Sequence, residues 1–234
     1  MTLSLLDRDG FVVLPAIFTP AECEALITEW DTRSRGGAGV LQTESGHIYG
    51  AHNLLELWPG VASVGRQPPL PETFATVLGP DYGLVRVLFF DKPPAASWAL
   101  PWHKDLTIAV RNNTLPSRHF THPTRKTGLP HVEAPTWLLE RMLTARVHLN
   151  EVTEENGPLQ VLPGSHRTGK DLIAAEPRLI LAERGDVLLM RPLLAHASGH
   201  AAPGTRRHRR ILHLEFAALR NLPDGYAWHD FVAP

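Results

Sequence analysis

The second half of the chain, residues 81–217, is a series of short apolar segments separated by turn-forming residues. The segments with the length and composition of strands occupy residues 84–90, 101–110, 144–152, 159–162, 179–182, 187–191 and 211–216. Short strands at this spacing are typical of two sheets that fold over each other, as in jelly-roll and cupin barrels. This half of the chain therefore predicts a mainly β architecture with a barrel-like double sheet.

The first 80 residues show a helical pattern instead. Helices are expected at residues 20–33, 53–64 and 71–78. The first has a complete start signal, in which Thr19 is the N-cap, Pro20 takes the first helical position and Glu22 completes a capping box. Residues 38–52 are ambiguous and allow a strand pair. Helices followed by strands predict an α+β domain with N-terminal helices packed on one sheet.

Composition sets only broad limits. With 234 residues, 43% of them hydrophobic, the chain is long enough for one sizeable core, so we expect a single domain over residues 1–234. A net charge of −1 gives no bulk attraction to nucleic acid or to an anionic membrane. The single cysteine excludes an internal disulfide, and the N-terminus lacks the apolar run of a signal peptide. A cytoplasmic protein is therefore expected, and the residue order leaves its oligomeric state open.

Residues 111–135 show no clear period and are rich in proline, glycine, threonine and histidine. A structureless segment of this length inside a compact domain is usually a functional lid or a disordered excursion. Four basic residues precede its first acidic residue, namely Arg111, Arg118, Arg125 and Lys126. The segment predicts either a solvated basic loop or an active-site lid whose charge attracts an anionic substrate.

A short polar motif lies in the predicted strand 101–110. Side chains alternate across a strand, so His103 and Asp105 are expected on one face and Lys104 on the other. With the distant His196, they could occupy one triangular face of a metal ion, as in non-haem Fe(II) oxygenases. The chain has no Gly-rich phosphate loop, Cys-x-x-Cys pair or His-Glu-x-x-His helix that would favour another chemistry.

Three blocks of sequence surround these residues, namely FFDKPPAASWALPWHKDLTIAV (89–110), ARVHLNEVTEENGPLQVLPGSH (145–166) and LLMRPLLAHASGHAAPGTRRHRRILHLEFA (188–217). In these blocks and their order, the chain resembles the phytanoyl-CoA dioxygenase family of Fe(II)/2-oxoglutarate oxygenases. The resemblance implies a double-stranded β-helix with Fe(II) at its mouth, bound by His103, Asp105 and His196. It also implies 2-oxoglutarate as cosubstrate and O2 as oxidant.

The cosubstrate needs a cation for its distal carboxylate, and the planar fork of arginine suits a carboxylate. Four arginines follow the distal histidine, namely Arg206, Arg207, Arg209 and Arg210. The resemblance selects Arg209 for this role, and Arg210 and Arg207 are the next candidates. It also implies that the hydroxyl of Ser198 assists that arginine. Alternation places Arg209 on the face of Ile211 and His213, but it does not show which face points inward.

Two further positions are expected near the cosubstrate. Arg146 lies where relatives present a side chain to 2-oxoglutarate, although a surface arginine is an equal alternative. Leu88 shares a strand face with Arg86 and Lys92, and this face also approaches the cosubstrate if it points inward.

The reaction implied by the resemblance is hydroxylation of an unactivated C–H bond, with release of succinate and CO2. Related halogenases lack the carboxylate ligand, so the retained Asp105 favours hydroxylation, or a desaturation or ring closure that starts in the same way. The substrate is expected to be a small molecule, and the basic segment favours an anionic one. Two alternatives remain: a cupin-like metalloenzyme that does not use 2-oxoglutarate, and a non-catalytic small-molecule-binding barrel. An arginine from 206–210 in the metal pocket would argue against the first alternative, and the intact set of His103, Asp105 and His196 argues against the second.

Overall fold

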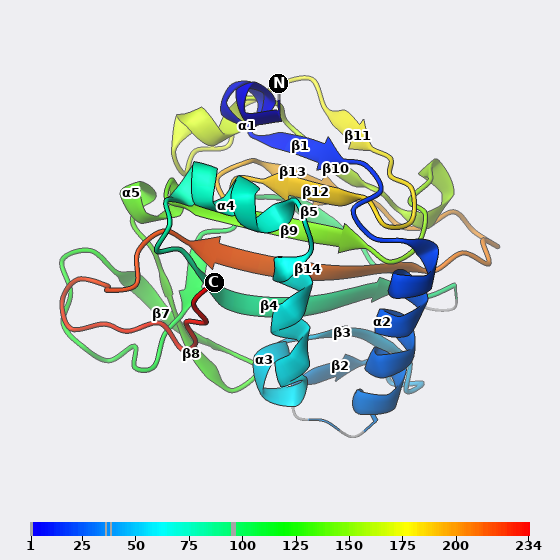
Figure 1. Ribbon diagram of the computed structural model, residues 1–234, viewed down its shortest axis with the longest axis horizontal. Helices are drawn as coiled ribbons and strands as arrows, with labels where there is room; N and C mark the ends of the chain where they lie inside the picture. Colours follow the sequence, from blue (N-terminus) through cyan, green and yellow to red (C-terminus); the bar gives the residue numbers. More distant parts are fainter. Residues whose placement is uncertain (1, 36, 38, 95–96) are drawn as a thin grey trace.

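The computed structural model describes residues 2–35, 37, 39–94 and 97–234. Its largest element is an antiparallel sheet of seven strands within these residues, which crosses the whole molecule in Figure 1. In spatial order the strands are β1 (Phe11–Leu14), β12 (Val187–Met190), β9 (Met142–His148), β14 (Arg209–Ala217), β4 (Gly83–Lys92), β3 (Ile48–Ala51) and β2 (Val40–Gln42).

Two smaller antiparallel sheets complete the β structure of the described residues. One has the order β11 (Arg178–Ile180), β10 (Leu159–Val161), β13 (His196–Ser198) and β5 (Leu100–His103). The other has the order β6 (Thr107–Ala109), β8 (Leu129–Glu133) and β7 (Thr121–Lys126). The prediction of a mainly β, double-sheet fold is confirmed, but the sheets of the described residues remain separate and do not join into one closed barrel.

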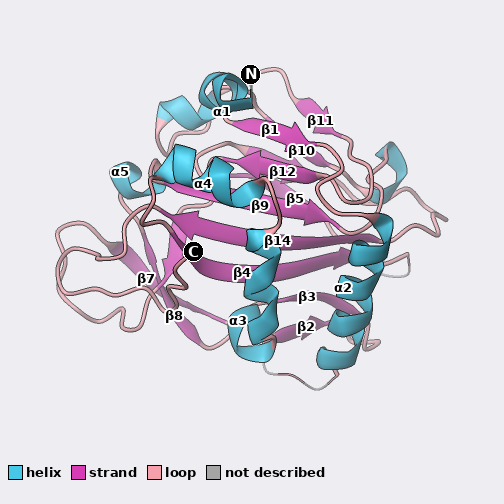
Figure 2. Ribbon diagram, viewed as in Figure 1, coloured by secondary structure: helices cyan, strands magenta, loops and turns pink. Residues whose placement is uncertain are grey.

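Helices cover one face of the large sheet, as the N-terminal pattern predicts (Figure 2). They are α2 (Pro20–Arg33), α3 (Leu54–Leu57), the 3-10 helix η1 (Pro59–Arg66) and α4 (Leu70–Leu78). The start of α2 has the expected capping box, because the Glu22 N–H donates to Thr19 Oγ1 at 3.2 Å and the Thr19 N–H donates to Glu22 Oε2 at 2.7 Å. Local sequence therefore determined where this helix begins.

Four short helices lie elsewhere: α1 (Thr2–Asp9), α5 (Thr136–Leu139) and the 3-10 helices η2 (Glu154–Asn156) and η3 (Ser165–Thr168). Helix α1 was not predicted. A helix of eight residues is marginal by itself, and this one is stabilised by packing of its buried residue Leu6. No helix among the described residues is both long and apolar enough to cross a membrane.

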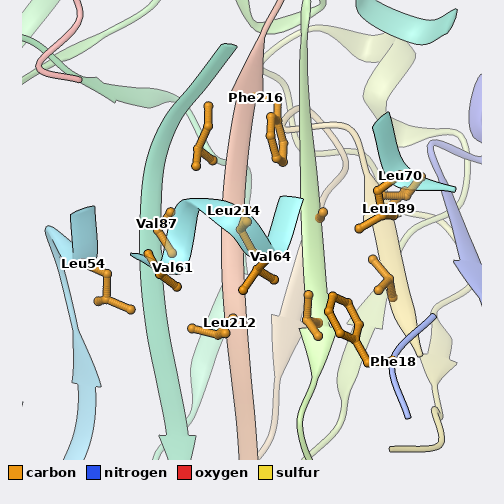
Figure 3. Packing of buried hydrophobic residues seen from close by; sticks show 14 of the residues in the cluster. Phe18, Leu54, Val61, Val64, Leu70, Val87, Leu189, Leu212, Leu214 and Phe216 are labelled. Carbon is orange, nitrogen blue, oxygen red and sulfur yellow. The ribbon is translucent and has the colours of Figure 1, made fainter. Parts of the chain in front are cut away.

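The main hydrophobic core lies between these helices and the large sheet. Figure 3 shows Val61 and Val64 of η1 directed toward the sheet, where they meet Leu212 and Leu214 of β14 and Val87 of β4. All five side chains are buried. One face of the central strands is therefore apolar and covered by helices.

The opposite face of the same strands carries charge. On β14, the buried polar residues Arg209, His213 and Glu215 alternate with the apolar core positions Leu212 and Leu214. The strand register then gives their neighbours on the inner face: Arg209 pairs with Lys92, His213 with Leu88 and Arg146, and Glu215 with Arg86. The face left without helices is thus lined with ionisable groups.

The prediction of one strand over residues 101–110 is wrong. Strand β5 ends at His103, and β6 begins at Thr107 in a different sheet, so Asp105 lies in the break between them. The Asp105 N–H donates to the Pro192 carbonyl at 3.0 Å across this break. Strand alternation therefore does not set the direction of Asp105; the passage of the chain between two sheets does.

Residues 111–135 are not structureless, contrary to expectation. Strands β7 and β8 form a hairpin whose two turn residues, Thr127 and Gly128, have φ values of 45° and 86°. Positive φ at both positions is the conformation that two-residue hairpin turns require. The outer strand β7 is almost entirely exposed, so its sequence carries no apolar alternation that could have revealed it. The role of this hairpin as a lid remains a prediction.

Candidate functional site

The two histidines of the predicted metal group meet through strand pairing. His103 of β5 and His196 of β13 are direct partners in the antiparallel ladder, and Asp105 follows in the break after β5. Asp105 Oδ2 lies 3.8 Å from His196 Nε2. One ligand atom from each residue lies within 4.8 Å of the others, and no second such group occurs among the described residues.

Backbone carbonyls orient both imidazoles. His103 Nδ1 lies 2.7 Å from the Pro101 carbonyl, and His196 Nδ1 lies 2.9 Å from the Leu194 carbonyl. Each Nδ1 is therefore the protonated nitrogen that donates to a carbonyl, which leaves the Nε2 lone pair for a metal. Burial lowers the pKa of His196 to about 4, so this imidazole is neutral near pH 7.

The carboxylate completes a set of donors that fits a divalent metal ion. Burial by itself would raise the pKa of Asp105, but the nearby His196, His213 and His103 outweigh that effect and lower it to about 2. Its Oδ2 is buried and has no hydrogen-bond partner among the described residues. Two imidazoles with free Nε2 atoms and one ionised carboxylate on a shared face suit an Fe(II)-type ion that keeps open coordination positions.

Lys104, between two of these residues, points away from the group and is buried. Its ammonium donates to the Ser165 carbonyl at 2.8 Å, the Gly169 carbonyl at 2.7 Å and Thr168 Oγ1 at 3.0 Å. These acceptors belong to η3 and the residue that follows it. Lys104 therefore ties the metal-binding turn to the Pro-Gly-Ser-His turn, which sequence analysis could not show.

Replacing Lys104 with methionine is expected to lower the free energy of unfolding by about 1–3 kcal/mol, because it leaves buried acceptors without a donor. Metal affinity should fall as well, since the ligand turn loses its anchor. Chemical denaturation and anaerobic Fe(II) titration would measure the two effects. The control is Lys170→Met, because the partly exposed ion pair of Lys170 with Glu133 contributes only about 0–1 kcal/mol. Equal effects of both variants would contradict the assigned role.

A cavity of about 270 Å³ opens beside the metal-binding group. Residues of the large sheet, the four-stranded sheet and the β6–β8–β7 sheet all line it. The predicted metal ligands are part of its wall, and so are the predicted cosubstrate residues Leu88, Arg146, Ser198 and Arg209. The structure therefore places every site residue expected from the sequence around one cavity.

Of the four arginines that follow the distal histidine, Arg209 is the one that lines this cavity. It is 1% exposed, and its Nη1 donates to the Gly157 carbonyl at 2.8 Å while its Nε has no partner among the described residues. Burial, and next the charge of Arg146, lowers its pKa to about 9. A buried guanidinium with donors still unused is suited to a carboxylate ligand.

The other three arginines of the cluster lie outside the cavity lining. Arg207 is exposed and forms an ion pair with Glu151 at 2.5 Å. Arg210 Nε lies 3.5 Å from Asp91 Oδ2, and Arg206 is exposed. Alternation along β14 separates Arg210 from Arg209, and the inward face proves to be that of Arg209.

Ser198 and Lys92 form a polar pair beside Arg209. The Lys92 ammonium, which is fully buried, donates to Ser198 Oγ at 3.1 Å and to the Gly157 carbonyl at 3.3 Å. The ring of Trp98 covers both cations, with its centroid 4.7 Å from Lys92 Nζ and 5.8 Å from Arg209 Cζ. Lys92 therefore places a second basic group next to Ser198 and Arg209, both of which line the cavity.

Arg146 is buried in the cavity wall, so the surface alternative for it is wrong. Its Nη1 lies 3.0 Å from His213 Nδ1, and His213 Nε2 lies 3.3 Å from Glu215 Oε1. Three residues of this wall were not predicted from the sequence as site residues, namely His213, Glu215 and Trp98. The first two could have been found, because they share a strand face with Arg209.

Two facing antiparallel sheets with a His–Asp–His group and a buried arginine in one cavity define the class of double-stranded β-helix proteins with a non-haem metal site. The sequence profile of the phytanoyl-CoA dioxygenase (PhyH) family matches residues 6–208. The chain belongs to this family, and the resemblance inferred from its three sequence blocks is confirmed.

Two ectoine dioxygenases are similar in sequence to this chain. The ectoine dioxygenase of Bordetella parapertussis is 25% identical over 178 residues, which make up 74% of this chain and 51% of that protein. The ectoine dioxygenase of Streptomyces coelicolor is 24% identical over 183 residues, or 75% of this chain and 54% of that protein. The chain thus spans about half the length of the curated relatives that it matches.

Solved structures share the fold. EctD from S. alaskensis, in its structure with 2-oxoglutarate and 5-hydroxyectoine, matches with a TM-score of 0.69 and 21% identity, covering 93% of this chain and 75% of that chain. AviO1 from Streptomyces viridochromogenes Tue57 matches with a TM-score of 0.65 and 19% identity, covering 95% of this chain and 96% of that chain.

Proposed function

We propose that the protein is a non-haem Fe(II)- and 2-oxoglutarate-dependent dioxygenase that hydroxylates an unactivated C–H bond of a small, anionic molecule. One O2 and one 2-oxoglutarate would be consumed for each hydroxylated product, and succinate and CO2 would be released. The observation that carries the proposal is the presence of Arg209 in the same cavity as His103, Asp105 and His196. The names of the ectoine dioxygenase relatives, and the solved EctD structure with 2-oxoglutarate, support it.

Different residues of the chain would bind the metal, bind the cosubstrate and exclude water. His103, Asp105 and His196 would bind Fe(II), which when bound supplies the redox chemistry that couples 2-oxoglutarate decarboxylation to substrate oxidation. The Arg209 guanidinium, held by the Gly157 carbonyl, would bind the distal carboxylate of the cosubstrate. Hydrophobic side chains at this end of the cavity, among them Phe90, Trp98 and Leu159, would exclude water.

The two alternative functions explain fewer of these features. A cupin-like metalloenzyme without 2-oxoglutarate has no use for a buried, uncompensated arginine beside its metal, because burying such a charge without a ligand is unfavourable. A small-molecule-binding barrel without catalysis has no use for a buried carboxylate oxygen that lacks a partner next to two oriented imidazoles. We therefore prefer the oxygenase.

The test is an anaerobic titration of the protein with Fe(II) and 2-oxoglutarate, followed by addition of O2. A weak visible charge-transfer band is expected only when both are present, and succinate should form after O2 is added. Absence of both the band and succinate, in protein shown to hold the metal, would overturn the proposal. If the band appears but no more succinate forms than in the metal-free control, the protein binds Fe(II) and 2-oxoglutarate without turning them over. That result would favour a non-catalytic barrel.

A pH dependence follows from Lys92. Burial, and next the charges of Arg209 and Arg146, lowers the pKa of this lysine to about 6. A cosubstrate carboxylate beside Arg209 would favour the ammonium form and raise that pKa. Binding should therefore take up a proton near neutral pH, and the affinity for 2-oxoglutarate should be greatest below about pH 6 and fall as the pH rises.

Calorimetry in buffers of different ionisation enthalpy would measure this proton uptake. The Lys92→Met variant is expected to bind 2-oxoglutarate more weakly, to take up no proton and to lose the pH dependence. Equal proton uptake by both proteins would show that another group is responsible.

A further inference from the structure

The cavity has a second polar end, at a distance from Arg209 along strand β14. Strand β14 carries Arg209 near its start and Glu215 near its end, and both line the cavity. Six residues of strand correspond to roughly 20 Å. Arg86 is the neighbour of Glu215 on β4, so this end of the inner face carries one cation and one anion.

Glu215 is already paired. Its Oε1 lies 3.3 Å from Arg86 Nη1 and 3.3 Å from His213 Nε2. The other carboxylate in the cavity wall, Asp105, belongs to the metal group. Of these two acidic side chains in the cavity wall, one is thus assigned to the metal and the other is paired with Arg86, and neither forms an ion pair with Lys126 within 4.0 Å.

Lys126 supplies that further cation. It is the last residue of β7, directly before the Thr127–Gly128 turn, and its ammonium donates to Thr107 Oγ1 at 2.7 Å. A hydroxyl is neutral, and Lys126 forms no ion pair within 4.0 Å among the described residues. An ammonium has three donors, so at least one remains for a ligand.

Other unused donors lie near it. Arg86 Nε and His52 Nδ1 are buried without a hydrogen-bond partner among the described residues, and both residues line the cavity. Burial, and next the charge of Arg86, lowers the pKa of His52 to about 4, so this imidazole is neutral and adds no charge of its own. The loop that carries His52 is joined to the hairpin, because Asn53 Nδ2 donates to the Thr127 carbonyl at 3.5 Å.

We propose that Lys126, Arg86 and Thr107 form the subsite that binds a carboxylate of the primary substrate and holds its reacting C–H bond beside the metal group. This inference rests on the proposed function and assigns the substrate to the class of compact carboxylic acids. The cavity of about 270 Å³ must also accommodate 2-oxoglutarate, which limits the substrate to a small molecule. A charge-assisted hydrogen bond from the lysine would discriminate an acid from its neutral analogue.

The hairpin offers a matched control. Arg125 precedes Lys126 on β7, but it is exposed, donates to the Gly128 carbonyl at 2.8 Å and does not line the cavity. Neutralising Arg125 therefore removes one charge from the same hairpin without touching the subsite. Lys126→Arg keeps the charge and serves as the conservative variant.

The experiment uses the full chain with Fe(II) and saturating 2-oxoglutarate under anaerobic conditions, so that the Arg209 end is already filled. The probes are short straight-chain and cyclic monocarboxylic acids, each paired with its primary carboxamide, and binding is measured by calorimetry. The wild type is expected to bind its best acid at least about tenfold more tightly than the matching amide. Lys126→Gln should abolish this preference, Lys126→Arg should retain part of it and Arg125→Gln should retain all of it.

Two results would overturn the subsite: a wild type that binds no acid better than its amide, or a Lys126→Gln variant that keeps the preference. The unfolding midpoint of each variant shows whether it is folded. If Lys126→Gln is misfolded, the acid-over-amide preference of Lys126→Arg is compared with that of Arg125→Gln. Equal preferences in these two variants would then overturn the subsite. Failure of the proposed function would appear differently, as loss of the Fe(II)- and 2-oxoglutarate-dependent visible band before any probe is added.

Discussion

Replacing Asp105 with alanine is expected to abolish detectable 2-oxoglutarate turnover and to weaken Fe(II) binding by at least about a hundredfold. Loss of a residue that only contacts a metal ligand already weakens metal binding by up to about a hundredfold, so loss of a ligand itself should cost at least as much. The reason is geometric. Asp105 is the anionic member of the three-residue group, and its buried Oδ2 has no other partner among the described residues. Without it, two imidazoles remain, and they hold a divalent ion far more weakly.

Anaerobic Fe(II) titration and a succinate assay would measure the two losses. The matched control is Asp81→Ala, which removes a carboxylate from an exposed position outside the cavity. It should leave metal affinity and turnover as in the wild type. An Asp105→Ala protein that binds Fe(II) normally would show that the ion sits elsewhere, and the assignment of all three ligands would then be wrong.

The second large effect is expected for Arg209→Met, which should raise the KM for 2-oxoglutarate at least about thirtyfold. Removing one partner of a buried, hydrogen-bonded charge pair costs about 2–5 kcal/mol of binding free energy. The stability of the protein should not fall in parallel. Burial lowers the pKa of Arg209, so the charge is unfavourable in the empty cavity and an apolar side chain there is tolerated. A specific loss of cosubstrate binding is therefore distinct from unfolding.

The neighbouring arginines provide the controls. Arg207→Met removes an exposed ion pair with Glu151, and Arg210→Met removes a contact with Asp91, both outside the cavity lining. Their KM for 2-oxoglutarate should stay within about threefold of the wild type, the scale of a surface ion pair. If Arg210→Met raises the KM and Arg209→Met does not, the inward face of β14 has been misassigned.

Much of the site could be predicted because its chemistry depends on local residue types. His103 and Asp105 are close in the chain, so any compact fold of this segment keeps them near each other. Of the four arginines that could bind 2-oxoglutarate, the resemblance to the family selected Arg209, and Arg209 is the one that lines the cavity. The substrate-side subsite could not be predicted, because Lys126, Arg86 and Thr107 come from three separate strands.

Two errors have a common cause. Residues 101–110 were expected to form one strand, and residues 111–135 to be structureless. In the structure the chain leaves one sheet after His103 and enters another at Thr107, where β6 pairs with β8 of the hairpin. Sheet membership depends on hydrogen bonds to distant strands, and the sequence of one segment does not contain this information.

The sequence by itself determined the residue types, the capped start of helix α2, the alternation along β14 and the family of the chain. Only the tertiary structure decided which face of β14 points inward. An isolated strand has two equivalent faces, and the choice depends on what covers each one. Here helices bury Leu212 and Leu214 on one side, so Arg209, His213 and Glu215 are left to line the cavity on the other.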